Sequence, residues 1–198
     1  MENQLSPAIA VMPGSSLYAS ALAGWRTGLL ATFSWIALGI ESIIHPQQNN
    51  IRDLYWMIPF TLTALTFVYL HRLQRSATFL TEQIAFYALM GSMALVWLGN
   101  VGLLTDQPLL TIFSFPYGPL LWISALIGYG VVTLKINRLP RYVGWTLILL
   151  EPVSLLCGLA LSPVAPLLDR GAYSAGVEKG MAVFLVAWGI RSLTRRIN

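Results

Sequence analysis

The chain alternates between six long apolar stretches and short polar connections. A helix needs roughly 20 mainly apolar residues to cross the hydrocarbon core of a bilayer. The pattern therefore predicts an all-α bundle of six transmembrane helices, at residues 22–44, 54–70, 84–104, 110–134, 142–161 and 177–193. Because the connections are short, consecutive helices are expected to run antiparallel within a single domain, residues 17–198.

Residues 1–16 differ from the rest of the chain, since they contain two prolines and lack Lys and Arg. A secretory signal peptide begins with a basic region. We therefore predict a loose N-terminal tail here, with the first apolar stretch acting as its own insertion signal.

Positive charges in the connections predict the orientation. Nine of the 12 Lys and Arg residues fall on one side of the predicted bundle and three on the other. Cytoplasmic loops carry the excess of Lys and Arg, so both ends are expected in the cytoplasm, an N-in/C-in topology. The charges near the ends of the second, fourth and sixth stretches form a basic collar, made of Arg72, Arg75, Lys135, Arg138, Arg141, Arg191, Arg195 and Arg196. Such a collar attracts anionic headgroups, so membrane lipids are expected partners and bound lipid is compatible with the sequence.

Composition favours lipid over water as the solvent. Of all residues 56% are hydrophobic and only 10% are charged, whereas soluble domains usually carry about 25% charged residues. The net charge of +4 would suggest nucleic acid in a soluble protein. Here the positive residues cluster beside the apolar stretches without interleaved aromatics, so no nucleic-acid partner is expected.

Glu151 lies at the middle of the fifth stretch. A carboxylate at mid-bilayer costs a few kcal/mol at least, so such residues usually face the bundle interior. Gly144, Ser154 and Gly158 follow the same helical stripe, which is small and polar. Pro152 comes directly after Glu151 and is expected to kink the helix and free a backbone carbonyl. Two interpretations stay open: a cation or proton site, and a protonated Glu that makes one interhelical hydrogen bond.

Several polar residues are expected nearer the outer side of the membrane. Glu41 lies near the end of the first stretch, Asn100 near the end of the third, and Glu178 and Lys179 near the start of the sixth. Together they would line an outward vestibule above Glu151; alternatively, each reaches interfacial water. The candidate ligand-binding or ion-binding residues are Glu151, Ser154, Asn100 and Glu41.

The third and fourth stretches also carry small residues at helical spacing, including Gly99, Gly102, Gly128 and Gly130. Small residues let neighbouring helices approach closely, so these positions are interpreted as packing sites.

No catalytic motif is visible in the sequence. The two histidines, His45 and His71, fall at opposite faces of the predicted membrane, so they cannot share a haem or a metal ion. No phosphate-binding loop, serine-hydrolase elbow or dinucleotide fingerprint occurs. We therefore expect no enzyme activity, no cofactor and no metal site. An enzyme acting on lipid or isoprenoid substrates would require Glu41, Asn100 and Glu151 to meet in one cavity.

Two short stretches carry a resemblance. Ile44-His45-Pro46 and the sequence RLPRYVGW at residues 138–145 resemble parts of small, uncharacterised bacterial membrane proteins with six spans. The resemblance implies an integral protein of the bacterial inner (cytoplasmic) membrane, and it implies no mechanism and no role for Glu151. Length and span count are also similar to those of substrate-capturing membrane subunits of vitamin importers, without a shared motif.

Two functions follow as hypotheses. The first is a non-enzymatic membrane protein that binds or translocates a small solute or cation, with Glu151 as the central polar group. The second is an accessory or structural subunit of a larger membrane complex, or of an assembly with itself, because the connections are minimal and no extramembrane domain is visible.

Overall fold

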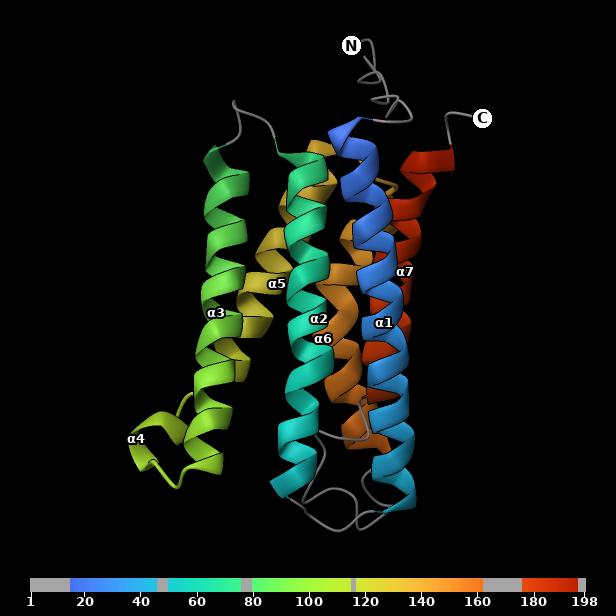
Figure 1. The fold of residues 1–198 in the computed structure, drawn as a ribbon. Coiled ribbons are helices and arrows are strands. Elements are labelled where there is room, and N and C mark those ends of the chain that lie inside the picture. Colours follow the sequence, from blue (N-terminus) through green and yellow to red (C-terminus); the bar gives the residue numbers. More distant parts are fainter. Residues whose placement is uncertain (1–14, 46–49, 76–79, 115–116, 162–175, 196–198) are drawn as a thin grey trace.

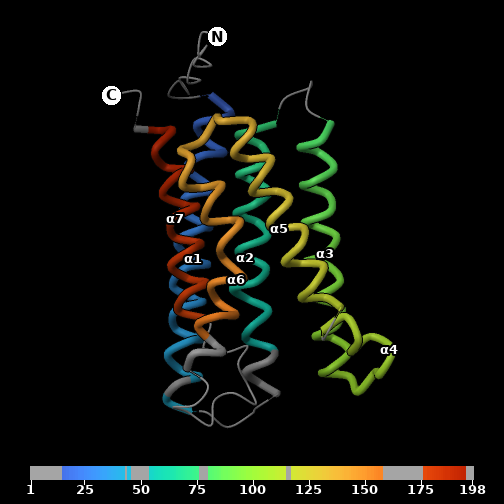
Figure 2. Tube along the Cα trace, turned by 180° about the vertical axis from the view of Figure 1, so that it is seen from behind, coloured from blue at the N-terminus to red at the C-terminus, as the bar shows by residue number. Residues whose placement is uncertain are grey.

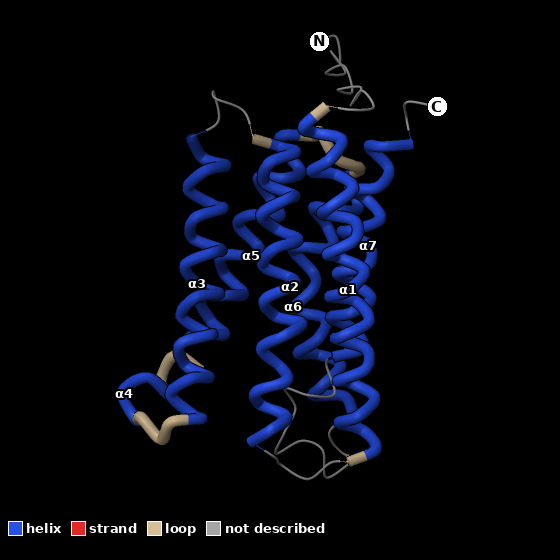
Figure 3. The backbone as a smooth tube through the Cα atoms, in the orientation of Figure 1, coloured by secondary structure: helices blue, strands red, loops and turns tan. Residues whose placement is uncertain are grey.

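The computed structural model describes residues 15–45, 50–75, 80–114, 117–161 and 176–195, and these residues are almost entirely helical (Figures 1 and 3). The described helices are α1 (Ser16–Ile44), α2 (Asn50–Gln74), α3 (Leu80–Leu104), α4 (Pro108–Thr111), α5 (Tyr117–Ile136), α6 (Arg141–Leu161) and α7 (Gly176–Arg195). The predicted all-α class is confirmed.

Apart from α4, which has four residues, each described helix has 20 residues or more. These long helices run up and down, so α1 begins and α7 ends at the same end of the bundle (Figures 1 and 2). In the packing, α1 lies against α2 and α7, α3 lies against α5, and α6 joins the two groups by contacting both α5 and α7.

Three helices in the described part of the chain are long and apolar enough to cross a membrane: Leu54–Gln74, Leu80–Leu104 and Tyr117–Ile136. Large apolar side chains also point outward from the bundle, among them Phe33, Ile84, Leu156 and Met181, each about 60% exposed or more. Such a surface is unfavourable in water and favourable against lipid. The remaining three crossings and the N-in/C-in orientation stay predictions.

The fourth predicted span, residues 110–134, is placed differently in the structure. Residues 108–111 form α4, which folds back beside the end of α3, and the long helix begins only at Tyr117 (Figure 1). Asp106 takes a positive φ of 51° in the turn before α4, and Pro108 begins the short helix. Apolar composition alone cannot reveal this reversal, because α4 is itself apolar.

Glycines on α3 make room for the reversed segment. A Cβ at Gly102 would lie 2.5 Å from Leu110 Cβ, and one at Gly99 would collide with the backbone of Ser114. The small residues of α3 therefore let the segment around α4 pack closely against α3. The sequence had predicted that a neighbouring transmembrane helix would pack there.

Close helix–helix approach does occur elsewhere. On α5, a Cβ at Gly130 would lie 2.8 Å from the carbonyl oxygen of Gly144 on α6, whereas a Cβ at Gly128 would meet nothing within 4 Å. Between α1 and α7, a Cβ at Gly28 would lie 2.5 Å from Ala187 Cβ. Hence Gly130 packs a neighbouring helix as predicted, and Gly128 does not.

Helix boundaries extend beyond the apolar stretches. The first helix begins at Ser16, and the Ser15 side chain caps it by accepting a hydrogen bond from the Tyr18 backbone N–H at 3.1 Å. The predicted tail otherwise lies outside the described residues. The second helix, α2, continues beyond the predicted span to Gln74, and α3 starts before its predicted span, at Leu80. Polar residues at the end of α2 and the start of α3 are therefore helical.

Candidate functional site

The Glu151 side chain points into the bundle, and the residue is 8% exposed. Its Oε1 lies 3.2 Å from Lys179 Nζ of α7, and it accepts a 2.7 Å hydrogen bond from the indole N–H of Trp122 on α5. The carboxylate therefore joins three helices through one oxygen. The positive partner makes the ionised carboxylate tolerable in an apolar interior, where an unpaired one would be costly.

Aromatic rings surround the Lys179 ammonium. Nζ lies 5.5 Å from the ring centroid of Trp35 and 5.9 Å from that of Trp56, both within the range of cation–π attraction. Neighbouring rings continue the wall, since Trp56 stacks on Phe60 at 4.8 Å and Phe60 lies 5.3 Å from Trp122. We call Trp35, Trp56, Phe60 and Trp122 the aromatic box.

Hydrogen bonds fix part of the aromatic box in place. The Trp35 indole N–H donates to the Thr63 hydroxyl at 2.9 Å, and that hydroxyl donates to the Pro59 carbonyl at 2.7 Å. Because Trp35 lies on α1 and Thr63 on α2, the hydrogen bond between them links these two helices beside the site. The indole N–H of Trp56, by contrast, is buried without a hydrogen-bond partner.

A small cavity of about 10 Å³ lies within the site, and its walls are Trp35, Phe60, Thr63, Trp122, Leu150, Glu151, Lys179 and Val183. That volume is close to the minimum for a single water molecule. The free space beside the ion pair is therefore too small for more than a water molecule, and a larger ligand would have to displace Lys179.

The other predicted site residues lie apart from this cavity. Ser154 is buried further along α6. Asn100 accepts a 3.1 Å hydrogen bond from the Ser114 hydroxyl beside α4. Glu41 is about half exposed and lies 3.7 Å from His45 Nδ1 on its own helix. None of these three side chains lines this cavity, and the outward vestibule above Glu151 stays a prediction.

Sequence reasoning missed two parts of the site. Lys179 was interpreted as an outer-level residue and Trp56 was not assigned to the site, yet Lys179 pairs with Glu151 and the Trp56 ring lies beside the Lys179 ammonium. One signal was available: a buried carboxylate requires a cation, and Lys179 is the Lys or Arg nearest to the start of the neighbouring apolar stretch. Nothing in the sequence indicates that Trp35, Trp56 and Trp122 converge.

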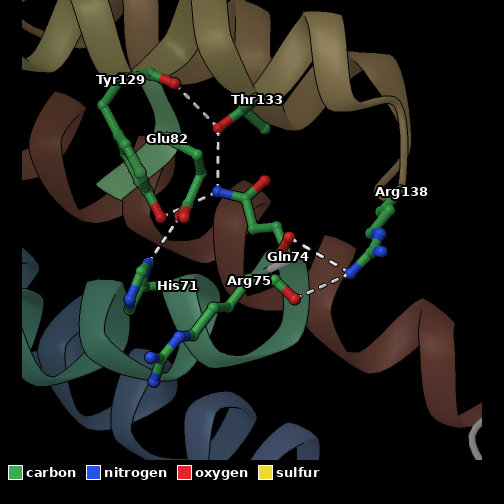
Figure 4. A network of polar contacts seen from close by, with 7 residues as sticks. All are labelled: His71, Gln74, Arg75, Glu82, Tyr129, Thr133 and Arg138. Carbon is green, nitrogen blue, oxygen red and sulfur yellow. Dashed lines mark hydrogen bonds and ion pairs between the residues drawn. The ribbon is translucent and has the colours of Figure 1, made fainter. Parts of the chain in front are cut away.

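A second buried polar network occupies the Arg-rich end of the bundle (Figure 4). His71 Nδ1 lies 2.5 Å from Glu82 Oε1, and the His71 ring stacks on Phe86 at 3.9 Å. Nearby, the Gln74 side-chain amide donates to the Tyr129 hydroxyl at 2.8 Å and to the Thr133 hydroxyl at 3.1 Å. These contacts join α2 to α3 and α5. The sequence did not predict these contacts, because the second predicted span ended at residue 70 and the third began at residue 84. His71, Gln74 and Glu82 therefore fell in the predicted connection between them.

The basic collar is partly engaged within the protein. Arg138 donates to the backbone carbonyls of Gln74 at 3.3 Å and Arg75 at 3.0 Å, so it satisfies the C-terminal end of α2 (Figure 4). Arg191 lies over the Trp25 ring at 4.8 Å and Arg72 over the Tyr69 ring at 5.5 Å. The Arg195 side chain and Arg196 lie outside the described parts. Arg75 and Arg141 are exposed.

The geometry describes an all-α bundle whose interior holds one ion pair within an aromatic box. Among the described residues, no group of three or more His, Cys, Asp or Glu side chains is placed to hold a metal ion. No protein-family model, curated protein or solved structure matches the chain. Function must therefore be argued from the site itself.

Proposed function

We propose that this protein is a non-enzymatic integral membrane protein that binds or translocates a small cation at Glu151. One observation carries the proposal: a buried carboxylate already holds a cation inside aromatic walls, at the middle of α6. Ionisable residues within a membrane-spanning segment usually mark a ligand or ion pathway, because their burial is otherwise unfavourable.

The proposal also includes the orientation of the bundle in the membrane. Six membrane crossings with both ends in the cytoplasm of a bacterial cell would place Glu151 near the bilayer midplane. Three apolar helices, the outward-facing apolar side chains and the common end of α1 and α7 support this placement. The basic collar would then lie at the cytoplasmic face, next to anionic lipid headgroups.

Replacing the carboxylate tests the proposal directly. Glu151→Gln keeps the size of the side chain and removes its charge, so binding or uptake of small cations should fall to background in reconstituted vesicles. Glu41→Gln is the matched control, because Glu41 is half exposed and does not line the cavity. A helical circular dichroism spectrum and a single elution peak would show that both variants fold. Unchanged cation binding in a folded Glu151→Gln protein would refute the proposal.

The small cavity favours a second candidate, an accessory or structural subunit of a larger membrane assembly. With about 10 Å³ inside the site and Lys179 already paired, Glu151 would serve only to hold α6 against α7. Co-purification with membrane partners after mild extraction, combined with unchanged cation binding in Glu151→Gln, would support this candidate over the first.

A further inference from the structure

The Lys179 ammonium, although part of the cavity lining, makes the contacts that a bound ammonium ion would make with Glu151, Trp35 and Trp56. We infer that Lys179 is a tethered occupant of the Glu151 site, and that the free ligand is a primary ammonium ion on a short unbranched apolar chain. This inference rests on the proposed function and narrows the class of cation.

The chemistry of the lining favours an organic cation over an inorganic one. Na⁺ or K⁺ must exchange its hydration shell for several oxygen ligands. The lining offers the Glu151 carboxylate and the Thr63 hydroxyl, and that hydroxyl already accepts from Trp35 and donates to Pro59. An ammonium group instead gains from one carboxylate and from ring faces, which the aromatic box supplies.

The space at the site sets the shape of the ligand. About 10 Å³ is free, so a ligand has to use the volume that the Lys179 stem and ammonium now fill. A quaternary ammonium head is wider than the Nζ group and would need more room than the Lys179 ammonium now takes up beside Trp35 and Trp56. A linear primary amine matches the shape of the Lys side chain itself.

The inference requires the Lys179 ammonium to swing away from Glu151. Lysine carries its ammonium on a flexible four-carbon stem, and rotations about that stem move the charge by several ångström. The Lys179 and Glu151 side chains are 14% and 11% exposed, against 9% and 0% for His71 and Glu82. The Glu151 pair is therefore the more accessible of the two.

Truncation of the tether provides the test. Lys179→Ala removes the Cγ, Cδ, Cε and Nζ atoms, which together correspond to n-propylammonium. The full-length protein is titrated with n-propylammonium chloride by calorimetry, and 1-propanol serves as the uncharged probe of equal length. We expect the unmodified protein to bind n-propylammonium, Lys179→Ala to bind it at least tenfold more tightly, and 1-propanol to bind neither.

Two further variants keep the test decisive. Glu151→Gln should lose n-propylammonium binding. The double variant Lys179→Ala with Glu151→Gln removes both charges, so it reports whether any misfolding of Lys179→Ala comes from the uncompensated carboxylate. If that single variant fails to fold, the comparison of the unmodified protein with Glu151→Gln still decides the outcome.

Binding to Lys179→Ala without any binding to the unmodified protein would overturn the inference, because Lys179 would then be a permanent structural partner. Binding of K⁺ or Na⁺ that depends on Glu151, with no response to n-propylammonium, would overturn the inference and leave the proposed function standing. No response to any of these cations would overturn both.

Discussion

At the scale of single residues, two buried carboxylates with their partners stand out in the described interior. A charge at the centre of a membrane helix costs about 3 kcal/mol on insertion scales. Lys179 and the Trp122 indole offset this cost for Glu151, while Glu82, in the first turn of α3, is paired with the His71 ring. Removal of one member of either pair leaves a buried polar group without its partner, which is more harmful than removal of both.

This asymmetry gives a prediction at the His71–Glu82 pair. His71→Ala should lower the free energy of unfolding by about 3 kcal/mol, because Glu82 is 0% exposed and loses its partner. The double variant His71→Ala with Glu82→Leu should recover most of the loss. Unfolding by denaturing detergent, followed by circular dichroism, measures both.

His45→Ala is the matched control for that prediction. The His45 side chain is 71% exposed and its contact with Glu41 is 3.7 Å, so its removal should cost less than about 1 kcal/mol. Equal losses for His45→Ala and His71→Ala would contradict the structural role assigned to the buried pair.

At the scale of helices, backbone approach decides which elements pair. Helices α5 and α6 meet where Gly130 and Gly144 face each other, and α1 meets α7 at Gly28 and Ala187. In lipid the hydrophobic effect does not drive helices together, so close van der Waals packing at small residues does much of that work. The Glu151 site depends on these approaches, since its residues come from α1, α2, α5, α6 and α7.

Two glycines on α5 provide a matched test of this packing. Gly130→Ala should destabilise the protein by about 1–3 kcal/mol, because its Cβ would lie 2.8 Å from both the Gly144 carbonyl oxygen and Ile148 Cγ1. Gly128→Ala should be neutral or slightly stabilising, since nothing lies within 4 Å. Thermal unfolding in detergent separates the two, and equal midpoints would contradict the α5–α6 contact.

At the scale of the whole molecule, an even number of crossings would bring the two ends together. The start of α1 and the end of α7 lie at one end of the bundle, together with the basic C-terminal ends of α2 and α5 (Figure 1). That end also contains the His71–Glu82 pair and the Arg138 contacts, so it is tied together by polar bonds (Figure 4).

Reporter fusions test this topology. A fluorescent protein that folds only in the cytoplasm should be active at both ends of the chain, and a periplasmic phosphatase should be inactive at both. The reason is the bias of Lys and Arg toward cytoplasmic loops. Activity of opposite kinds at the two ends would contradict an even number of crossings.

The sequence by itself determined the all-α fold class of this protein, because apolar stretches of helical length predict helices whether or not the neighbouring helices are known. It also indicated Glu151 as the central polar residue, since a lone carboxylate within an apolar stretch requires burial against other helices. It could not predict the reversal at α4, because residues 108–111 are as apolar as a spanning helix.

Only the tertiary structure decided what surrounds Glu151. Lys179 lies on α7, and Trp35, Trp56 and Trp122 come from three different helices, α1, α2 and α5. It also decided that Glu41 and Asn100 stay apart from the site. Helical periodicity reveals which face of a helix is polar, but not which helix that face meets. The choice of neighbour depends on where glycines let backbones approach and where opposite charges can pair.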